Sequence, residues 1–214
     1  MKRILTALIA FLLATGPVLA QTANSWTTVA EVAKRSTVFI EGPNGSCSGF
    51  VINDSAKGGE DKSENVDLIL TAAHCDGPAL FAGGVPAKMR AKDLRKDLMV
   101  IEVENLNKPA LKLADKNPRV GDEVVSFGFG YGLDEPMLRI AHIANDKTYI
   151  PFEGIGGPLM TIDASFVPGQ SGGPVLNHAS EVVMIVQLGT SIVGFGVGAE
   201  DIRDKVGRFF GEVK

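Results

Sequence analysis

The sequence is poor in the residues on which small cross-linked or metal-dependent domains rely. Its 214 residues include two cysteines, three histidines and one tryptophan. Basic residues are also in short supply, because 21 lysines and arginines face 25 acidic residues for a net charge of −4. Without a basic excess, the chain lacks the electrostatic footprint of a protein that binds nucleic acid or an anionic membrane. No internal repeat indicates a solenoid.

Only one long apolar run is present, and it lies at the beginning of the chain. Residues 4–13 are almost unbroken apolar sequence after a short basic head, and a glycine-proline pair ends the run shortly before Ala20. This is the three-part pattern of a secretory signal peptide. A membrane anchor is the alternative, but the run is shorter than the roughly 20 apolar residues that span a bilayer. We therefore expect a signal peptide over 1–20, one domain over 21–214, and an exported protein, periplasmic or extracellular.

The rest of the chain favours short strands over helices. Its 25 glycines and 11 prolines interrupt segments rich in β-branched and aromatic residues. Helices are expected only over 27–35, opened by a threonine cap, and over 200–210, where apolar residues share one face. The expected strands are 36–41, 46–53, 66–73, 97–104, 111–114, 123–128, 137–143, 159–164, 174–176, 182–188 and 192–197. Many short strands of this kind predict an all-β sandwich or barrel.

Export changes the interpretation of the two cysteines. In an oxidising compartment a small, even number of cysteines indicates a disulfide, so Cys47 and Cys75 are expected to form one. A zinc site is the alternative, but two cysteines without matched spacing or histidine partners make a weak ligand set. The sequence thus predicts a disulfide and no metal site.

One serine lies within a glycine-rich turn, GQSGGP, at Ser171. A serine nucleophile must be exposed at a tight turn where main-chain N–H groups can face a developing oxyanion, and glycine permits such a turn. Taken alone, a glycine-serine segment is more often an ordinary loop. Ser171 is a candidate nucleophile only if partners for it exist elsewhere in the chain.

Two further segments supply such partners. His74 ends the apolar segment TAAHC, and Asp97 begins the segment DLMVIEV. Each is ordinary by itself, because a histidine at a strand end is usually structural and acids commonly begin strands. Their order along the chain, histidine then aspartate then serine, is one of the three orders known for catalytic serine triads. The other histidines, His142 and His178, lack motif context and are expected to be structural or surface residues.

Together these segments resemble a known family. His74 in TAAHC, Asp97 in DLMVIEV and Ser171 in GQSGGP are similar to the three catalytic motifs of trypsin/chymotrypsin-like serine proteases. Cys47 in SCSGF and Cys75 directly after the histidine resemble that family's disulfide beside the catalytic histidine. The segment FGFGYGL and the ending GFGVGAEDI look closest to bacterial HtrA-type and glutamyl-endopeptidase-like members. We expect no PDZ domain, which HtrA-type enzymes commonly add.

The resemblance implies a fold of two six-stranded antiparallel β-barrels with the active site between them. The N-terminal barrel would cover about 36–105 and the C-terminal barrel about 109–198. The short terminal helix at 200–210 would follow them.

The resemblance also implies a role for each site residue. Ser171 would attack the scissile carbonyl, and His74 would take the serine proton and later deliver it to the leaving group. Asp97 would hold the imidazole in the right tautomer. The main-chain N–H groups of Gly169 and Ser171 would form the oxyanion hole.

Two positions depart from the trypsin-like pattern. Gln170 stands where zymogen-activated members carry an aspartate that pairs with a newly freed N-terminus, so no activation by propeptide cleavage is expected. Ser165 stands where trypsin-like members carry an acid that receives arginine or lysine. We therefore expect a specificity pocket at Ser165 that takes a small or medium apolar side chain at P1, the substrate residue on the N-terminal side of the scissile bond.

The sequence as a whole predicts a serine endopeptidase, a hydrolase that acts on proteins or peptides through an acyl-enzyme. It is expected to be a monomer, with no cofactor, no nucleic-acid partner and no membrane anchor after signal cleavage. The acidic loop with Glu60, Asp61 and Glu64 does not have EF-hand spacing and is expected to be solvated surface.

Two other interpretations remain. One is a catalytically silent or latent trypsin-fold binding module, which would have no need of an intact triad. The other is an α/β-hydrolase esterase. Its G-x-S-x-G motif is satisfied here, but its chain order is serine, acid, histidine, and its fold alternates strands with helices.

Overall fold

The computed structural model of the chain describes residues 25–43, 45–52, 66–150 and 156–210. The expected signal peptide and the acidic loop with Glu60, Asp61 and Glu64 lie outside these residues. Within them, none of the helices has the length and apolar character needed to cross a membrane.

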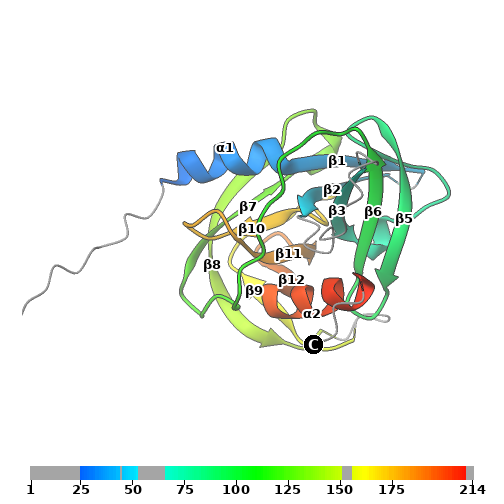
Figure 1. Cartoon of the computed structure of the whole chain (residues 1–214). Helices are drawn as coiled ribbons and strands as arrows, with labels where there is room; N and C mark the ends of the chain where they lie inside the picture. The colour runs from blue at the N-terminus through cyan, green and yellow to red at the C-terminus, as the bar shows by residue number, and fades with distance from the viewer. Residues whose placement is uncertain (1–24, 44, 53–65, 151–155, 211–214) are drawn as a thin grey trace, which may run out of the picture.

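Two closed antiparallel β-barrels, with a helix before the first and another after the second, make up the described chain (Figure 1). The first barrel contains β1 (Thr37–Gly42), β2 (Gly45–Ile52), β3 (Val66–Ala72), β4 (Leu80–Ala82), β5 (Val85–Asp93) and β6 (Leu98–Glu104). The second contains β7 (Glu123–Gly128), β8 (Met137–Thr148), β9 (Leu159–Ile162), β10 (Pro174–Leu176), β11 (Val182–Gly189) and β12 (Gly194–Gly198). The remaining elements are α1 (Trp26–Ser36), the 3-10 turns η1 (Ala73–Cys75) and η2 (Gly130–Gly132), and α2 (Ala199–Phe210).

The two barrels share one topology. Neighbouring strands follow the order β1-β2-β3-β6-β5-β4 in the first barrel and β7-β8-β9-β12-β11-β10 in the second. The pairs β1–β4 and β7–β10 close the barrels. This architecture confirms the expected all-β fold of two six-stranded antiparallel barrels with a short C-terminal helix.

The apolar cores explain why several strands are almost wholly hydrophobic. Side chains alternate between the two faces of a strand. In β3, Ile69 packs inside the first barrel, whereas Leu68 and Leu70 belong to a cluster that also contains Val125 and Leu176 of the second barrel. Both faces of β3 are therefore buried, one inside its barrel and the other against its neighbour, and the cluster shared by the barrels holds them together.

The structure differs from the sequence-based expectations in several strand ends, such as that of β8, which was expected to end at residue 143 and runs to Thr148. Three further differences concern other elements. The N-cap of α1 is Ser25, whose hydroxyl accepts the Thr28 N–H at 3.3 Å, so the helix begins before the expected threonine cap. Residues 111–114 form only isolated bridges, not a strand. Strands β4 and β5 were not expected, because β4 has three residues and β5 is mostly exposed and carries alternating basic side chains.

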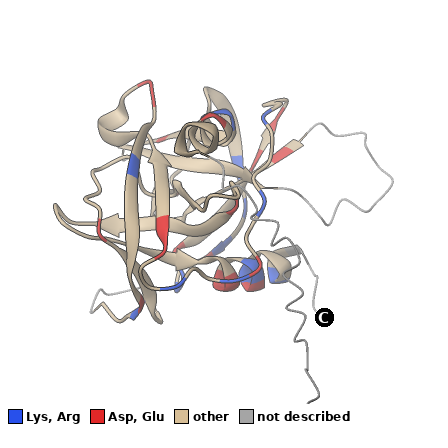
Figure 2. Ribbon diagram, turned by 90° about the vertical axis from the view of Figure 1, so that its left-hand side faces the viewer, with Lys and Arg blue, Asp and Glu red and all other residues tan. Residues whose placement is uncertain are grey.

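Basic and acidic residues are interspersed along the ribbon of the described elements (Figure 2). This distribution agrees with the small net charge of the chain.

Candidate active site

The pairing of β3 with β6 in the first barrel brings His74 and Asp97 together. Residues Ala72 and Leu98 are opposite each other in this strand pair, so η1, which follows β3, lies beside the residue that precedes β6. One carboxylate oxygen of Asp97 is 2.7 Å from Nδ1 of His74, and the other accepts the His74 main-chain N–H at 2.8 Å. Asp97 is buried, whereas about half of the His74 side chain is exposed. Asp97 thereby fixes both the backbone and the ring of His74.

The backbone at Asp97 is held in a conformation that few residues adopt. Its φ of 50° lies in the left-handed region, which aspartate tolerates better than most residues other than glycine. The preceding turn is closed by Asp93, whose carboxylate accepts the main-chain N–H groups of Arg95 and Lys96 at 2.9 and 3.0 Å. The turn thus presents Asp97 to His74 at the start of β6.

Two ion pairs connect helix α2 to this turn. Nζ of Lys205 is 2.8 Å from a carboxylate oxygen of Asp93, and Nζ of Lys96 is 2.7 Å from a carboxylate oxygen of Asp201. Burial alone would raise the pKa of the Asp93 carboxyl, but the Lys205 ammonium and the main-chain N–H groups beside it hold that pKa below its usual value. The C-terminal helix therefore stabilises the segment that carries Asp97.

Ser171 lies in the loop that precedes β10, and it connects to Asp97 through one residue. The Ser171 hydroxyl donates a hydrogen bond of 3.0 Å to the main-chain carbonyl of Gln187 in β11. The buried side chain of Gln187 donates through Nε2 to the main-chain carbonyl of Asp97 at 2.7 Å. Among the described residues, Ser171 makes no hydrogen bond to His74. All three candidate triad residues thus lie at the junction of the barrels, with the serine hydroxyl turned to Gln187.

The loop before β10 is anchored through its carbonyl groups. The carbonyls of residues 168, 169, 170 and 171 accept, in that order, from Tyr131 N–H (2.7 Å), Ser48 Oγ (2.8 Å), Gly173 N–H (3.0 Å) and Ser48 N–H (2.7 Å). In the described parts of the chain, the N–H groups of Gly169 and Ser171 donate to no protein acceptor. Because the C=O and N–H of a trans peptide point to opposite sides, the anchored carbonyls turn these two donors away from their anchors.

Glycine at position 172 lets this loop approach the first barrel. Gly172 has a φ of 82°, and a β-carbon there would collide with the Ser48 carbonyl and with the Thr71 hydroxyl. The same approach brings Gly172 against Ala72, two residues before His74. The glycine-rich sequence is thus required by the close contact between the barrels as well as by the turn.

Gln170 is buried and carries no charge. Its side-chain oxygen accepts the Val167 N–H at 3.0 Å, and its main-chain N–H donates to the Val167 carbonyl at 3.2 Å. The residue therefore closes the loop from within, using neutral hydrogen bonds in place of an ion pair.

The space next to Ser165 is occupied by its neighbour. Phe166 is only 8% exposed, and its ring packs so closely on Gly189 and Gly194 that a β-carbon at either glycine would collide with it. These glycines are paired in the β11–β12 hairpin, and Gly189 comes two residues after Gln187, which binds the Ser171 hydroxyl. The Phe166 ring thus covers the paired ends of β11 and β12, two residues beyond Gln187. Ser165 lies half-buried beside this ring.

Cys47 and Cys75 form a disulfide, as the sequence predicts. It joins β2 to η1, directly before Ser48 and directly after His74. The donor atoms of Cys47, His74 and Cys75 lie within 4.8 Å of one another. Both sulfur atoms are consumed by the disulfide, and a cysteine binds a metal ion only as a thiolate, so this group does not fit a metal ion.

The other two histidines lie in ion pairs away from the junction. His142 Nδ1 is 3.2 Å from Asp163, and the main-chain N–H of His142 is the chief cause that holds the pKa of the Asp163 carboxyl below its usual value. His178 is 3.6 Å from Glu123 and stacks on Trp26 with the ring centres 3.8 Å apart.

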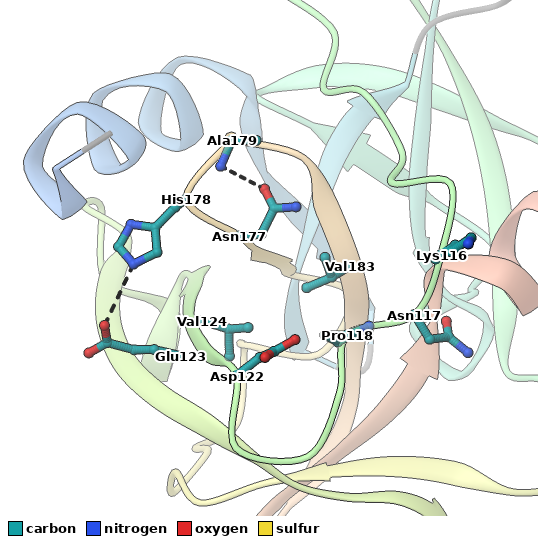
Figure 3. Close-up of a pocket in the computed structure, with 10 residues that line it drawn as sticks. All are labelled: Lys116, Asn117, Pro118, Asp122, Glu123, Val124, Asn177, His178, Ala179 and Val183. Atoms are coloured by element: carbon teal, nitrogen blue, oxygen red, sulfur yellow. Dashed lines mark hydrogen bonds and ion pairs between the residues drawn. The ribbon is translucent and has the colours of Figure 1, made fainter. Parts of the chain in front are cut away.

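A cavity of about 400 Å³ lies on the second barrel, next to His178 (Figure 3). Its lining residues are Lys116, Asn117, Pro118, Asp122, Glu123, Val124, Asn177, His178, Ala179 and Val183. Neither His74, Asp97 nor Ser171 is among them. The chemistry of the junction is therefore separate from this cavity.

Sequence reasoning missed three residues at the junction: Ser48, Gln187 and Phe166. A signal existed for Gln187, because it is the one strongly polar residue in the buried strand VVMIVQLG. Phe166 could have been suspected from its place five residues before the serine. Nothing local distinguishes Ser48, whose partners lie far along the chain.

Comparison with known proteins supports one family. Residues 47–185 match the family described as "Trypsin-like peptidase domain". The chain is 34% identical over 105 residues to a "Probable periplasmic serine endoprotease DegP-like" of Pseudomonas putida, a match that covers 46% of this chain and 20% of that protein. It is 30% identical over 138 residues to "Periplasmic serine endoprotease DegP" of Escherichia coli, covering 60% of this chain and 29% of that protein. The chain thus spans only about a fifth to three tenths of the length of these relatives.

Solved structures show the same fold. An inactive mutant form of Rv3671c from M. tuberculosis superimposes with a TM-score of 0.69 at 20% identity, covering 87% of this chain and 91% of that one. The serine endoprotease from Yersinia pestis superimposes with a TM-score of 0.68 at 21% identity, covering 88% of this chain and 68% of that one. At such low identity these likenesses concern the fold alone.

Proposed function

This chain belongs to the trypsin-like peptidase domain family, and we propose that it is a serine endopeptidase that hydrolyses peptide bonds through His74, Asp97 and Ser171. The observation that carries the proposal is the double hydrogen bond from His74 to the buried carboxylate of Asp97. It holds the proton on Nδ1 and so leaves Nε2 as the ring nitrogen that can accept one.

The proposed reaction begins when the Ser171 hydroxyl leaves the Gln187 carbonyl and turns to Nε2 of His74. Oγ attacks the scissile carbonyl carbon while its proton passes to Nε2, and Asp97 stabilises the imidazolium that forms. The tetrahedral intermediate collapses as His74 gives this proton to the leaving amine, which yields an acyl-enzyme. Water then attacks the ester carbonyl carbon and gives a proton to Nε2 of His74. The bond from this carbon to Oγ breaks, His74 returns the proton to Oγ, and the carboxylic acid product leaves with the serine restored.

The N–H groups of Gly169 and Ser171 would bind the oxyanion of both tetrahedral intermediates. Each lacks a protein acceptor within the described residues, and each is oriented by carbonyls that are anchored elsewhere. Donors fixed in advance require no reorganisation as the charge develops, and removal of one such donor costs about 3 kcal/mol of transition-state stabilisation.

Phe166 supports a preference for a small apolar side chain at P1. Its ring fills the space against Gly189 and Gly194, beside the half-buried Ser165. A large P1 side chain would meet this ring, and Ser165 carries no charge to receive a basic one. The substrates proposed are therefore proteins or peptides cut after small or medium apolar residues.

The proposed site of action is the periplasm or the cell exterior. The matched relatives carry the word periplasmic in their names, and the first twenty residues have the pattern of a signal peptide. The structural disulfide agrees with an oxidising compartment. We propose a monomer that acts without a cofactor.

One observation favours a second candidate, a latent enzyme or a silent binding module of the same fold. The Ser171 hydroxyl donates to the Gln187 carbonyl and not to His74. If this arrangement persisted in the presence of substrate, the serine would not be activated.

Covalent labelling with a fluorophosphonate probe, read by intact mass, separates the two candidates. A single adduct on the wild-type protein that is absent from S171A would demonstrate an activated nucleophile with a formed oxyanion site. A folded wild-type protein with the disulfide closed that takes no adduct would favour the silent or latent form. Cleavage of peptide libraries would then define the P1 preference.

A further inference from the structure

Ser48 uses every hydrogen-bonding group that it has, and it is fully buried. Its N–H donates to the Ser171 carbonyl at 2.7 Å, and its carbonyl accepts the Thr71 hydroxyl at 2.7 Å. Its hydroxyl donates to the Gly169 carbonyl at 2.8 Å and accepts the Phe129 N–H at 2.8 Å. A buried polar group with all partners in place gives a rigid, specified contact.

Three of these four bonds cross from the first barrel to the second. Ser48 lies in β2, whereas Gly169 and Ser171 lie in the loop before β10 and Phe129 follows β7. The two carbonyls that Ser48 binds belong to the same two residues whose N–H groups have no protein acceptor in the part of the chain that the structure describes. One residue therefore sets the position of the oxyanion donors relative to the barrel that carries His74 and Asp97, with its hydroxyl on Gly169 and its main-chain N–H on Ser171.

The hydroxyl also acts on the next anchor of the loop. The Ser48 hydroxyl oxygen accepts the Phe129 N–H, and this orients the hydroxyl proton toward the Gly169 carbonyl. Two residues after Phe129, the Tyr131 N–H binds the Pro168 carbonyl, and this peptide carries the N–H of Gly169. The peptide unit that presents the first oxyanion donor thus lies between the Gly169 carbonyl, which Ser48 binds directly, and an anchor at Tyr131, two residues from the Phe129 N–H that Ser48 accepts.

We propose that Ser48 is a positioning residue that holds the oxyanion loop against the first barrel. It touches no reacting atom, and its hydroxyl bonds to neither His74 nor Asp97 among the described residues. The inference rests on the proposed serine-protease function, because an oxyanion site matters only if Ser171 is the nucleophile.

The test measures how fast a fluorophosphonate probe phosphonylates Ser171 as a function of pH. Loss of the hydroxyl in S48A should slow the reaction about 10- to 100-fold, less than the 10²–10³-fold that follows removal of a donor. The apparent pKa of the pH profile should not move, because the His74–Asp97 pair is untouched. S48T keeps the hydroxyl and should recover most of the rate.

Two further variants separate positioning from general loss of stability. T37V removes another buried hydroxyl, one that donates to Ala33 at 2.7 Å outside the site, and should leave the labelling rate within about twofold. G128A adds a methyl group 3.0 Å from the Ser48 hydroxyl oxygen and 3.3 Å from the Gln170 α-carbon. It crowds the contact between Ser48 and the loop, and it should slow labelling even if S48A fails to fold. Thermal unfolding of each variant shows which of them are folded.

The outcomes are distinct for the two proposals. Slower labelling of S48A and G128A, with an unchanged pH profile and rescue by S48T, supports the positioning role. Wild-type labelling with an equal rate in S48A, an equal loss in T37V, or a shifted pH profile in S48A would overturn it and leave the proposed function intact. A folded wild-type protein without any adduct would overturn both.

Discussion

The side-chain amide of Gln187 donates a hydrogen bond of 2.7 Å to the main-chain carbonyl of Asp97, across the junction of the two barrels. The main-chain carbonyl of Gln187 at the same time accepts the hydroxyl of Ser171. One fully buried residue of β11 thus contacts both the acid and the serine. The relative position of Asp97 and Ser171 therefore depends on a residue that takes no part in the proposed proton transfer.

Replacing Gln187 by leucine should slow peptide hydrolysis about tenfold and destabilise the protein. The Asp97 carbonyl would lose one of its two donors and keep the Ala73 N–H at 3.0 Å, so the loss should cost about 1 kcal/mol, the lower end of the range for a buried hydrogen bond. The net cost should be smaller still, because Oε1 of Gln187 is buried with no hydrogen-bond partner among the described residues and would be removed too. Urea unfolding and kcat of Q187L measure the two effects. An unchanged kcat would show that this bond does not position the site.

Replacing Asp97 by asparagine should reduce turnover by about 10³- to 10⁴-fold with little change in the fold, because the imidazole loses its tautomer and its counter-charge. The chain contains a matched control. Asp163 binds His142 through the same two contacts, main-chain N–H and Nδ1, away from Ser171. D163N should retain kcat within about twofold. An equal loss in both variants would mean that histidine-aspartate pairing serves stability and not catalysis.

Replacing Phe166 by alanine should broaden the P1 preference toward leucine and phenylalanine. Their kcat/KM should rise about tenfold relative to alanine at P1, since each methylene accommodated in an apolar pocket contributes about 1 kcal/mol or more. The double variant F166A/G194V should restore the narrow preference, because valine would refill the space that the ring vacates. Cleavage of a P1 series measures both. A P1 profile that F166A leaves unaltered would place the specificity pocket elsewhere.

Removing the disulfide should destabilise the protein by about 3–4 kcal/mol, the chain-entropy value for a loop closed over a separation of 28 residues. The C47A/C75A variant should also label more slowly with the fluorophosphonate probe, because the cysteines adjoin Ser48 and His74. Urea unfolding with and without reductant provides the control. Reductant should weaken the wild-type protein to the level of the double variant and leave that variant unaffected.

Stability should depend on Asp93 at neutral pH and lose this dependence in acid. The pKa of its carboxyl is lower in the fold than in the unfolded chain, so its contribution is complete above about pH 5 and disappears as the pH falls through the folded value, below about pH 4. The difference in unfolding free energy between wild type and D93N should therefore shrink on acidification. K205M, which lacks the partner ammonium, should show a smaller pH-dependent difference. A difference that stays constant from pH 7 to pH 3 would contradict the assignment.

Much of the fold could be predicted from the sequence because its signals are local. Alternation of β-branched residues and turns indicates strands such as β2, β3 and β11, and the apolar face of residues 200–210 indicates α2. Strand β5 was not predicted from the sequence, because its exposed basic side chains are typical of a loop. Residues 111–114 have the composition of a strand, but they form only isolated bridges. In these cases burial, which depends on the neighbouring strands, overrides local composition.

The sequence by itself determined which residues are chemically able to form a triad, and in which order, because side-chain identity and flanking motif are properties of short segments. It also determined the only possible disulfide. The tertiary structure alone decided what holds these residues: Ser48 lies 121 residues from Gly169, and Gln187 lies 90 residues from Asp97. Such contacts have no local spacing to reveal them, since they form only when two closed barrels pack against each other.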